Sequence, residues 1–121
     1  MSWIVEYTDE FGAWWQGLTE AEQVSVAASV TLLEERGPQL GHPHSSLVHG
    51  TKVGHMRELR TQHAGRPLRT LYAFDPRRHA ILLIGGDKTG NGRWYEVFVQ
   101  KADILYETHL QELRNEGQID G

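Results

Sequence analysis

Three β-prone runs in the middle of the chain, joined by very short connections, constrain the fold more than any other feature. The runs cover about residues 55–60, 68–74 and 79–85. Turn-forming residues separate them, namely Ala64-Gly65-Arg66-Pro67 and Asp75-Pro76-Arg77-Arg78. Because a parallel pair needs a crossover of about a dozen residues or more, these strands are predicted to form an antiparallel meander.

Before this meander, the sequence predicts a short strand and a first helix. Residues 3–7 are β-prone, and residues 9–17 carry apolar side chains at helical spacing. Trp14 and Trp15 belong to this apolar face. Large aromatic residues at such spacing are typical of a core, so we expect both rings to pack inside rather than to form an exposed stacking platform.

A second helix, an irregular loop and a C-terminal helix complete the predicted fold. Thr19-Glu20-Ala21-Glu22 is typical of a capping box at a helix start, and Gly37-Pro38 indicates its end. Residues 39–53 lack periodicity and predict an irregular loop, whereas apolar positions over 101–116 predict a helix packed on the sheet. The predicted fold is α+β: a short N-terminal strand, a two-helix hairpin, an antiparallel sheet of about four strands and a C-terminal helix.

Size and composition indicate one globular domain over residues 1–121. No stretch reaches the roughly 20 apolar residues that span a bilayer. The N-terminal region, with Glu6, Asp9 and Glu10, also lacks the pattern of a secretory signal. We therefore expect a cytoplasmic protein without a membrane segment. The chain has no cysteine, which excludes disulfides, thiolate nucleophiles and cysteine-based zinc sites.

The charge of the chain is unevenly distributed. The formal net charge is −4, yet residues 51–93 hold nine basic and three acidic residues, a net +6, so the remainder carries −10. This segregation favours a basic surface that faces RNA on an acidic frame. The alternative is that the charged residues are solvated side chains on exposed strand faces.

Two basic residues stand out by position. Arg69 interrupts an apolar strand, where a guanidinium is costly unless it meets a partner or an anion, and an ion pair with Glu58 is the structural alternative. Lys88 follows the apolar run 80–87 and is predicted at the sheet rim beside a glycine-rich loop, although an ordinary exposed lysine fits the same pattern. Arg57 and Arg60 should lie on opposite faces, so only one can share a face with Arg69.

Histidines are numerous but give no metal-binding pattern. His42, His44 and His49 form the densest group, without a metalloprotease-like motif or a nearby acidic cluster. We therefore predict no metal and no cofactor. The alternative role for a histidine is that of a general base, since imidazole titrates near neutral pH, and His55 and His79 lie on predicted strands near the arginines.

The order of these elements resembles the RelE/ParE superfamily of toxins, and most closely its HigB-like host-inhibition branch. The resemblance covers about residues 1–116 and rests on Glu58-Leu59-Arg60, on Arg69-Thr70-Leu71-Tyr72 and on the apolar strand that ends near Lys88. It implies a RelE-like fold and a type II toxin–antitoxin toxin that cleaves mRNA on the ribosome, without a metal, through the RNA 2′-hydroxyl. The alternative is a non-catalytic, ParE-like inhibitor of a host protein such as DNA gyrase.

The resemblance also implies a site and a partner. The implied catalytic residues are Arg69, Lys88 and Tyr95, with the Tyr95 hydroxyl able to exchange a proton. A cognate antitoxin, expected to be a helix-turn-helix protein, is the implied protein partner. The implied RNA-binding residues, with Trp94 stacking on a base, are Arg57, Arg60, Arg66, Arg77, Arg78, Arg93 and Trp94.

Overall fold

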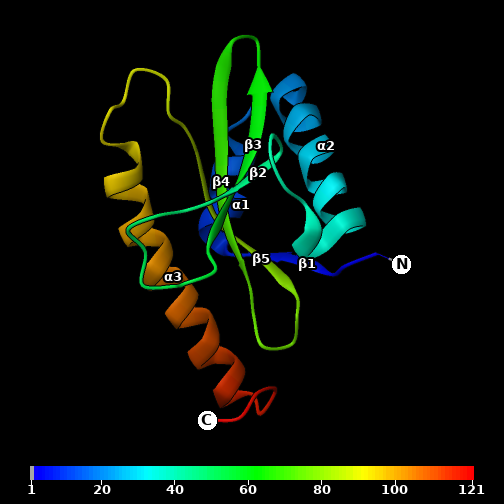
Figure 1. The fold of residues 1–121 in the computed structure, drawn as a ribbon, viewed down its shortest axis with the longest axis vertical. Coiled ribbons are helices and arrows are strands. Elements are labelled where there is room, and N and C mark those ends of the chain that lie inside the picture. Colours follow the sequence, from blue (N-terminus) through cyan, green and yellow to red (C-terminus); the bar gives the residue numbers. More distant parts are fainter. Residues whose placement is uncertain (1) are drawn as a thin grey trace.

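The computed structural model describes residues 2–121. In this part of the chain one five-stranded sheet forms, and it lies between helices (Figure 1). The strand order is β1-β5-β4-β3-β2. Helices α1 and α2 cover one face of the sheet, and α3 covers the other. The elements in chain order are β1 (Val5–Tyr7), α1 (Asp9–Gln16), α2 (Glu20–Arg36), the 3₁₀ turn η1 (Gly37–Gln39), β2 (Ser45–Leu47), β3 (Arg57–His63), β4 (Arg66–Phe74), β5 (Ala80–Asp87) and α3 (Trp94–Asn115).

The predicted α+β fold is confirmed, with three corrections. Strand β1 pairs with β5 in parallel, so the sheet is mixed rather than wholly antiparallel. The segment predicted as an irregular loop contains β2, a three-residue strand too short for a sequence period, which pairs with β3. Helix α3 begins at Trp94, seven residues earlier than predicted, because Trp94 and Phe98 extend its apolar face toward the glycine-rich loop.

Side-chain caps fix where α1 and α2 begin. The predicted capping box is present: Thr19 N donates to Glu22 Oε1 at 2.8 Å, and Glu22 N donates to Thr19 Oγ1 at 3.1 Å. At α1, Thr8 Oγ1 accepts from Phe11 N at 3.0 Å and donates to Leu83 O of β5 at 2.6 Å. The start of α1 is thereby attached to the sheet. Helix α2 ends at Gly37, whose φ of +55° suits glycine.

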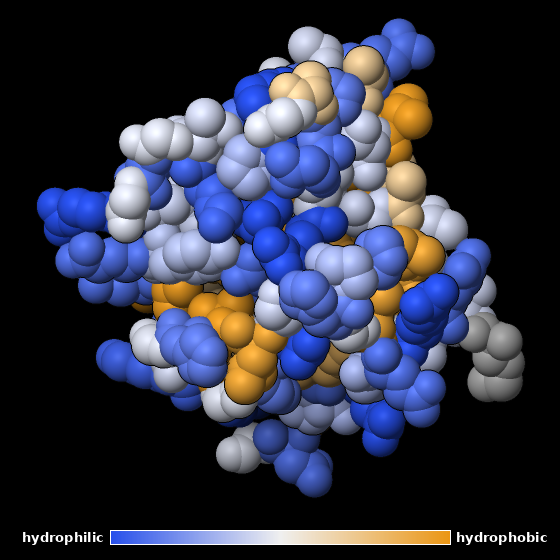
Figure 2. All heavy atoms as spheres, turned by 45° about the horizontal axis from the view of Figure 1, so that its top comes forward, coloured by the Kyte–Doolittle hydropathy of each residue, from blue (hydrophilic) through white to orange (hydrophobic). Residues whose placement is uncertain are grey.

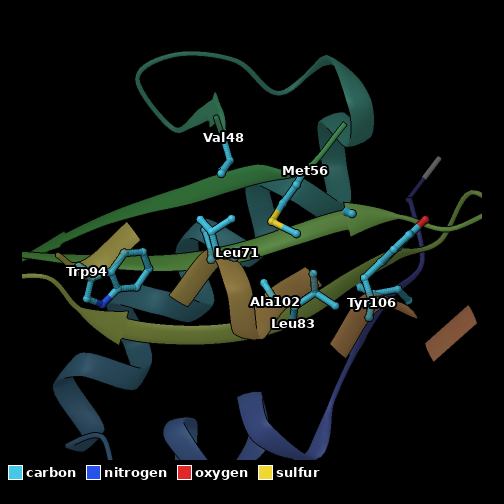
Figure 3. Packing of buried hydrophobic residues seen from close by; sticks show 10 residues of the cluster. Val48, Met56, Leu71, Leu83, Trp94, Ala102 and Tyr106 are labelled. Carbon is cyan, nitrogen blue, oxygen red and sulfur yellow. The ribbon is translucent and has the colours of Figure 1, made fainter. Parts of the chain in front are cut away.

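Alternating residues of β4 and β5 supply two hydrophobic cores. Leu71 and Leu83 face α3, where they pack with Trp94 (Figure 3). Tyr72 and Leu82 face the opposite way and pack with residues of α1 and α2. The predicted alternation along β4 is therefore confirmed. Trp14 and Trp15 pack against this second core, as predicted.

The connection between β2 and β3 runs across the α3 side of the molecule (Figure 1). Val48 and Met56, near its ends, are buried in the core beneath α3. Thr51 Oγ1 donates to a carboxylate oxygen of Asp103, and Lys52 N donates to the other at 3.0 Å. The long connection is thus attached to α3. Among the described residues, no helix has both the length and the apolar character needed to cross a membrane.

Gly85 in β5 provides a direct test of this packing. A Cβ at this position would lie 2.2 Å from Cε3 of Trp14, so Gly85→Ala must displace an indole that packs against the core. We expect a loss of about 3 kcal/mol in the free energy of unfolding, measured with urea. Gly92→Ala, where no atom lies within 4 Å, is the matched control and should change stability little. Equal stabilities of the two variants would contradict this packing.

Candidate active site around Glu58

Glu58, on β3, is the centre of a charged cluster. Its side chain is about nine-tenths buried on the α3 face of the sheet. Glu58 Oε1 lies 3.0 Å from Arg69 Nε and accepts a hydrogen bond from the Tyr95 hydroxyl at 2.8 Å. Arg60 Nε lies 4.0 Å from the same oxygen. A carboxylate on β3 therefore gathers side chains from β3, β4 and α3.

The register of β3 on β4 explains why these residues meet. Arg60 lies opposite Arg69, so both share one face of the sheet, and Glu58 is the next residue along that face. Tyr95 reaches Glu58 from the first turn of α3. Arg57 points to the other face, where its Nε donates to Ser45 Oγ at 2.8 Å. The prediction that only one of these two arginines shares a face with Arg69 is confirmed.

Arg69 is buried, and the ion pair considered as its structural alternative is present. Its side chain is only 5% exposed, so its charge is neutralised mainly by Glu58. Nη1 donates to Leu68 O at 3.1 Å. Within residues 2–121, Nε has no partner with hydrogen-bond geometry, because its N–H is not aimed at the nearby Glu58 oxygen. The guanidinium therefore keeps unused donor capacity.

Lys88 and Tyr95 lie together at the rim of the sheet. Lys88 Nζ is 5.1 Å from the centre of the Tyr95 ring, a cation–π contact. Burial, and then the hydrogen bond to Glu58, raise the pKa of the Tyr95 hydroxyl. Tyr95 is therefore protonated at neutral pH and keeps a hydroxyl hydrogen that it can donate in a hydrogen bond. All three residues implied as catalytic converge on this cluster.

The prediction that Trp94 stacks on an RNA base is corrected by the structure, because Trp94 belongs to the core. Its residue exposure is 1%, and its ring stacks on Phe98 with centroids 4.4 Å apart. Nε1 also lies 2.8 Å from where a Cβ of Gly86 would be, so the indole sits directly on β5. The physical reason is the early start of α3, which turns Trp94 toward the sheet. The implied stacking of Trp94 on a base is incompatible with this packing.

Arg66 and Arg93 lie near the rim that carries Lys88 but are already paired. Arg66 forms ion pairs with Glu22 and, at 3.1 Å, with Asp87. Arg93 pairs with Glu96 at 3.0 Å, and its side chain is 75% exposed. Figure 2, which brings this end of the molecule forward, shows a mostly hydrophilic surface broken by smaller hydrophobic areas. These ion pairs make the rim less positive than the basic residues of the sequence alone would indicate.

Arg77 and Arg78 lie at the opposite end of β4 from Arg69 (Figure 1). Successive turns of a meander alternate between the two ends of the sheet, so a basic run in sequence need not form one surface. Arg77 is held by Asp75 at 2.7 Å and by Glu6 at 3.0 Å. Arg78 is exposed and lies over the Trp3 ring, 5.5 Å from its centre. Arg77 and Arg78 are therefore separated from Arg69 and Lys88, and an RNA-binding role for them stays a prediction.

Asp75 organises this second cluster. Its carboxylate is fully buried and accepts from Arg77 and, at 2.9 Å, from His109 Nε2 of α3. His79, considered as a general base, bonds instead to Glu6 at 2.9 Å. His55 packs edge-on against Tyr106. Over residues 2–121, no three His, Asp or Glu side chains are grouped as metal ligands would be.

The fold and this cluster can now be set beside known proteins. Residues 13–107 match the family described as "Phage derived protein Gp49-like (DUF891)". The chain belongs to this family. It is also 45% identical over 98 residues to "Putative toxin HigB3" of Mycobacterium tuberculosis, covering 80% of the chain and 84% of that protein.

A second relative gives the same relationship over more of the chain. The chain is 36% identical over 117 residues to "Putative toxin HigB2" of Mycobacterium tuberculosis, which is 95% of the chain and 58% of that protein. The chain thus spans little more than half the length of this relative. The resemblance to the HigB-like branch is confirmed.

Sequence reasoning missed the central position of Glu58. The glutamate was considered only as a structural partner of Arg69, whereas it also binds Tyr95. Part of this arrangement could be read from the sequence, because Glu58 and Arg60 are two residues apart and so share one face of a strand. That strand pairs with the strand of Arg69. The contact with Tyr95 was not available, because it depends on where α3 begins.

Arg77→Ala separates a structural role from an RNA-binding role. We expect the free energy of unfolding to fall by about 3 kcal/mol, because the buried Asp75 carboxylate loses its cation. Chemical denaturation measures this change. Arg93→Ala, which removes an exposed and paired arginine, is the control and should change stability little. A stable Arg77→Ala protein with impaired RNA binding would contradict the structural assignment.

Asp75 should also make the protein acid-sensitive. Burial alone raises the pKa of this carboxyl, but hydrogen bonds from Arg77, His109 and the His79 backbone outweigh it, and the pKa lies below the ordinary 3.8. The stabilisation is therefore present above about pH 4 and lost as pH falls through the folded-state pKa. Unfolding measured from about pH 6 to 3 should show this loss. Asp75→Asn should be less stable and show a flatter acid dependence.

Proposed function

We propose that this protein is the toxin of a type II toxin–antitoxin system and acts as an mRNA endonuclease on the ribosome. The observation that carries this proposal is the cluster in which Arg69 and Tyr95 contact Glu58 and Lys88 lies over the Tyr95 ring. The names of the two relatives support the toxin role. The partner implied by this role is an antitoxin that keeps the toxin inactive.

The reaction proposed for the cluster uses the RNA 2′-hydroxyl as nucleophile. This oxygen forms a bond to the adjacent phosphorus, the bond to the 5′-oxygen breaks, and a 2′,3′-cyclic phosphate and a 5′-hydroxyl result. Glu58 accepts the proton of the 2′-hydroxyl, and Tyr95 donates a proton to the departing 5′-oxygen. Their hydrogen bond at 2.8 Å lets the proton return from Glu58 to Tyr95 after each cycle.

Electrostatics divide the cations into two roles. Lys88 is half-buried at the rim, and its ammonium can approach the extra charge that develops on the phosphate. Arg69 is paired with Glu58 and acts first as a positioning residue, since it holds the carboxylate in the sheet. Replacing Arg69 with alanine would leave a buried, unpaired carboxylate and cost about 3–5 kcal/mol of stability. Arg69 variants are therefore poor tests of chemistry.

Lys88→Ala and Tyr95→Phe test the proposal without that difficulty. Induced in cells, the wild-type chain should arrest growth and leave transcripts with new 5′ ends inside coding regions, mapped by sequencing. We expect each variant to lower the rate of cleavage by about 100-fold, because each removes a group that acts in the transition state. The control is Arg114→Ala, which removes a cation near the far end of α3.

The outcome separates the two classes of function. Growth arrest with intact transcripts and DNA damage would instead support a ParE-like inhibitor of DNA gyrase. Cleavage that is unchanged in both variants would show that the Glu58 cluster is not the catalytic centre. Thermal unfolding of each purified variant should match the wild type, so that lost activity is not lost folding.

A further inference from the structure

A cavity adjoins the Glu58 cluster at the edge of β3 that faces away from β4. It has a volume of about 630 Å³ and lies between α2 and the outer edge of β3. Strand β2 pairs only with residues 57–59, so the edge of β3 beyond Arg60 is uncovered by a strand. Two arginines of the cluster, Arg60 and Arg69, also line this cavity. The cavity and the cluster are therefore contiguous.

The lining of this cavity suits an anion. Besides the two arginines, His42 and His44 line it, and none of its lining residues is an aspartate or a glutamate. A larger cavity elsewhere in the molecule has a more acidic lining. That cavity, between β1 and the C-terminal half of α3, has a volume of about 750 Å³ and is lined by Arg77 and His109 but also by five acidic residues, Glu6, Asp9, Glu10, Glu112 and Glu116.

The unused donor capacity of Arg69 is the second observation. The side chain is 95% buried, and Nε has no hydrogen-bond partner within residues 2–121. Because Glu58 Oε1 already lies 3.0 Å from Nε, a bound anion would instead meet the side of Arg69 that lines the cavity. Arg60, 34% exposed and 4.0 Å from Glu58, supplies an accessible cation at the same edge.

The remaining walls suit a nucleobase. Ala28, Leu32 and Pro43 give an apolar side, and Gln62 supplies an amide that can donate and accept. The volume lies within the range of small-molecule sites, about 300–1,000 Å³. A flexible single strand can turn one unstacked base into such a cavity, whereas a duplex cannot.

We infer that this cavity binds one nucleotide of single-stranded RNA next to the bond that is cut, with its phosphate on Arg60 and Arg69 and its base against α2. This inference rests on the proposed function and adds the path of the substrate. The RNA crosses the open edge of β3, from the Glu58 cluster to α2. The cavity therefore contributes to affinity and base preference, and the Glu58 cluster performs the chemistry.

Ala28→Trp tests this path by filling the cavity without removing a charge. The probe is a fluorescent, single-stranded 2′-O-methyl RNA hexamer, which lacks the nucleophile and cannot be cleaved. Fluorescence anisotropy with the purified protein should show binding that Ala28→Trp weakens by about tenfold or more. Ala21→Trp places the same ring on an exposed alanine in the first turn of α2, away from the cavity, and should bind like the wild type.

Arg60→Ala is a second, independent variant. It should weaken binding of the hexamer and reduce the salt dependence by about one phosphate contact. Equal binding by the wild type and Ala28→Trp, absent binding by the wild type, or equal binding of a duplex of the same length would each overturn the inference. Pocket-dependent binding without transcript cleavage in cells would preserve the site and overturn the proposed function. Transcript cleavage in cells, together with hexamer binding that Ala28→Trp leaves unchanged, would support the proposed function and overturn the inference about the cavity.

Discussion

A carboxylate and a guanidinium buried side by side, Glu58 and Arg69, form the interaction on which the rest of the site depends. Their charges are tolerable in the interior only because each neutralises the other. The pair requires the β3–β4 register to be correct, since a slip of one residue would place Glu58 and Arg69 on opposite faces of the sheet. The ion pair is therefore both a product of the fold and a constraint on it.

The pair also explains how an acidic protein can present a local cationic site. Arg66, Arg77 and Arg93 are each held by carboxylates of the same chain. Arg60 at the edge of β3 and Lys88 at the rim beside Tyr95 both remain partly exposed, so they can present positive charge near the cluster. Whether a basic residue is exposed or paired therefore depends on its position in the sheet, which the position in the sequence indicates only roughly.

The fold was predictable from local signals, and the site only in part. The capping box at Thr19, the turn at Asp75 and the alternation in β4 each act over a few residues, and each was read correctly. The parallel pairing of β1 depends on where the chain returns after α1 and α2, which no short pattern encodes. The stacking role of Trp94 was misassigned for a related reason, because its burial depends on where α3 begins. The contacts of Arg77 were missed because one of its carboxylate partners, Glu6, comes from the distant strand β1.

Helix α3 has a mechanical consequence beyond its share of the core. It is 22 residues long, about 33 Å, and it is fastened at both ends. Tyr95 in its first turn is bound to Glu58, while His109 in its last third is bound to Asp75. A helix held by side-chain hydrogen bonds at two distant points cannot slide or tilt against the sheet without breaking one of them. The placement of the Tyr95 hydroxyl is therefore set in part by a carboxylate at the far end of the sheet, which ties the geometry of the cluster to the integrity of the whole domain.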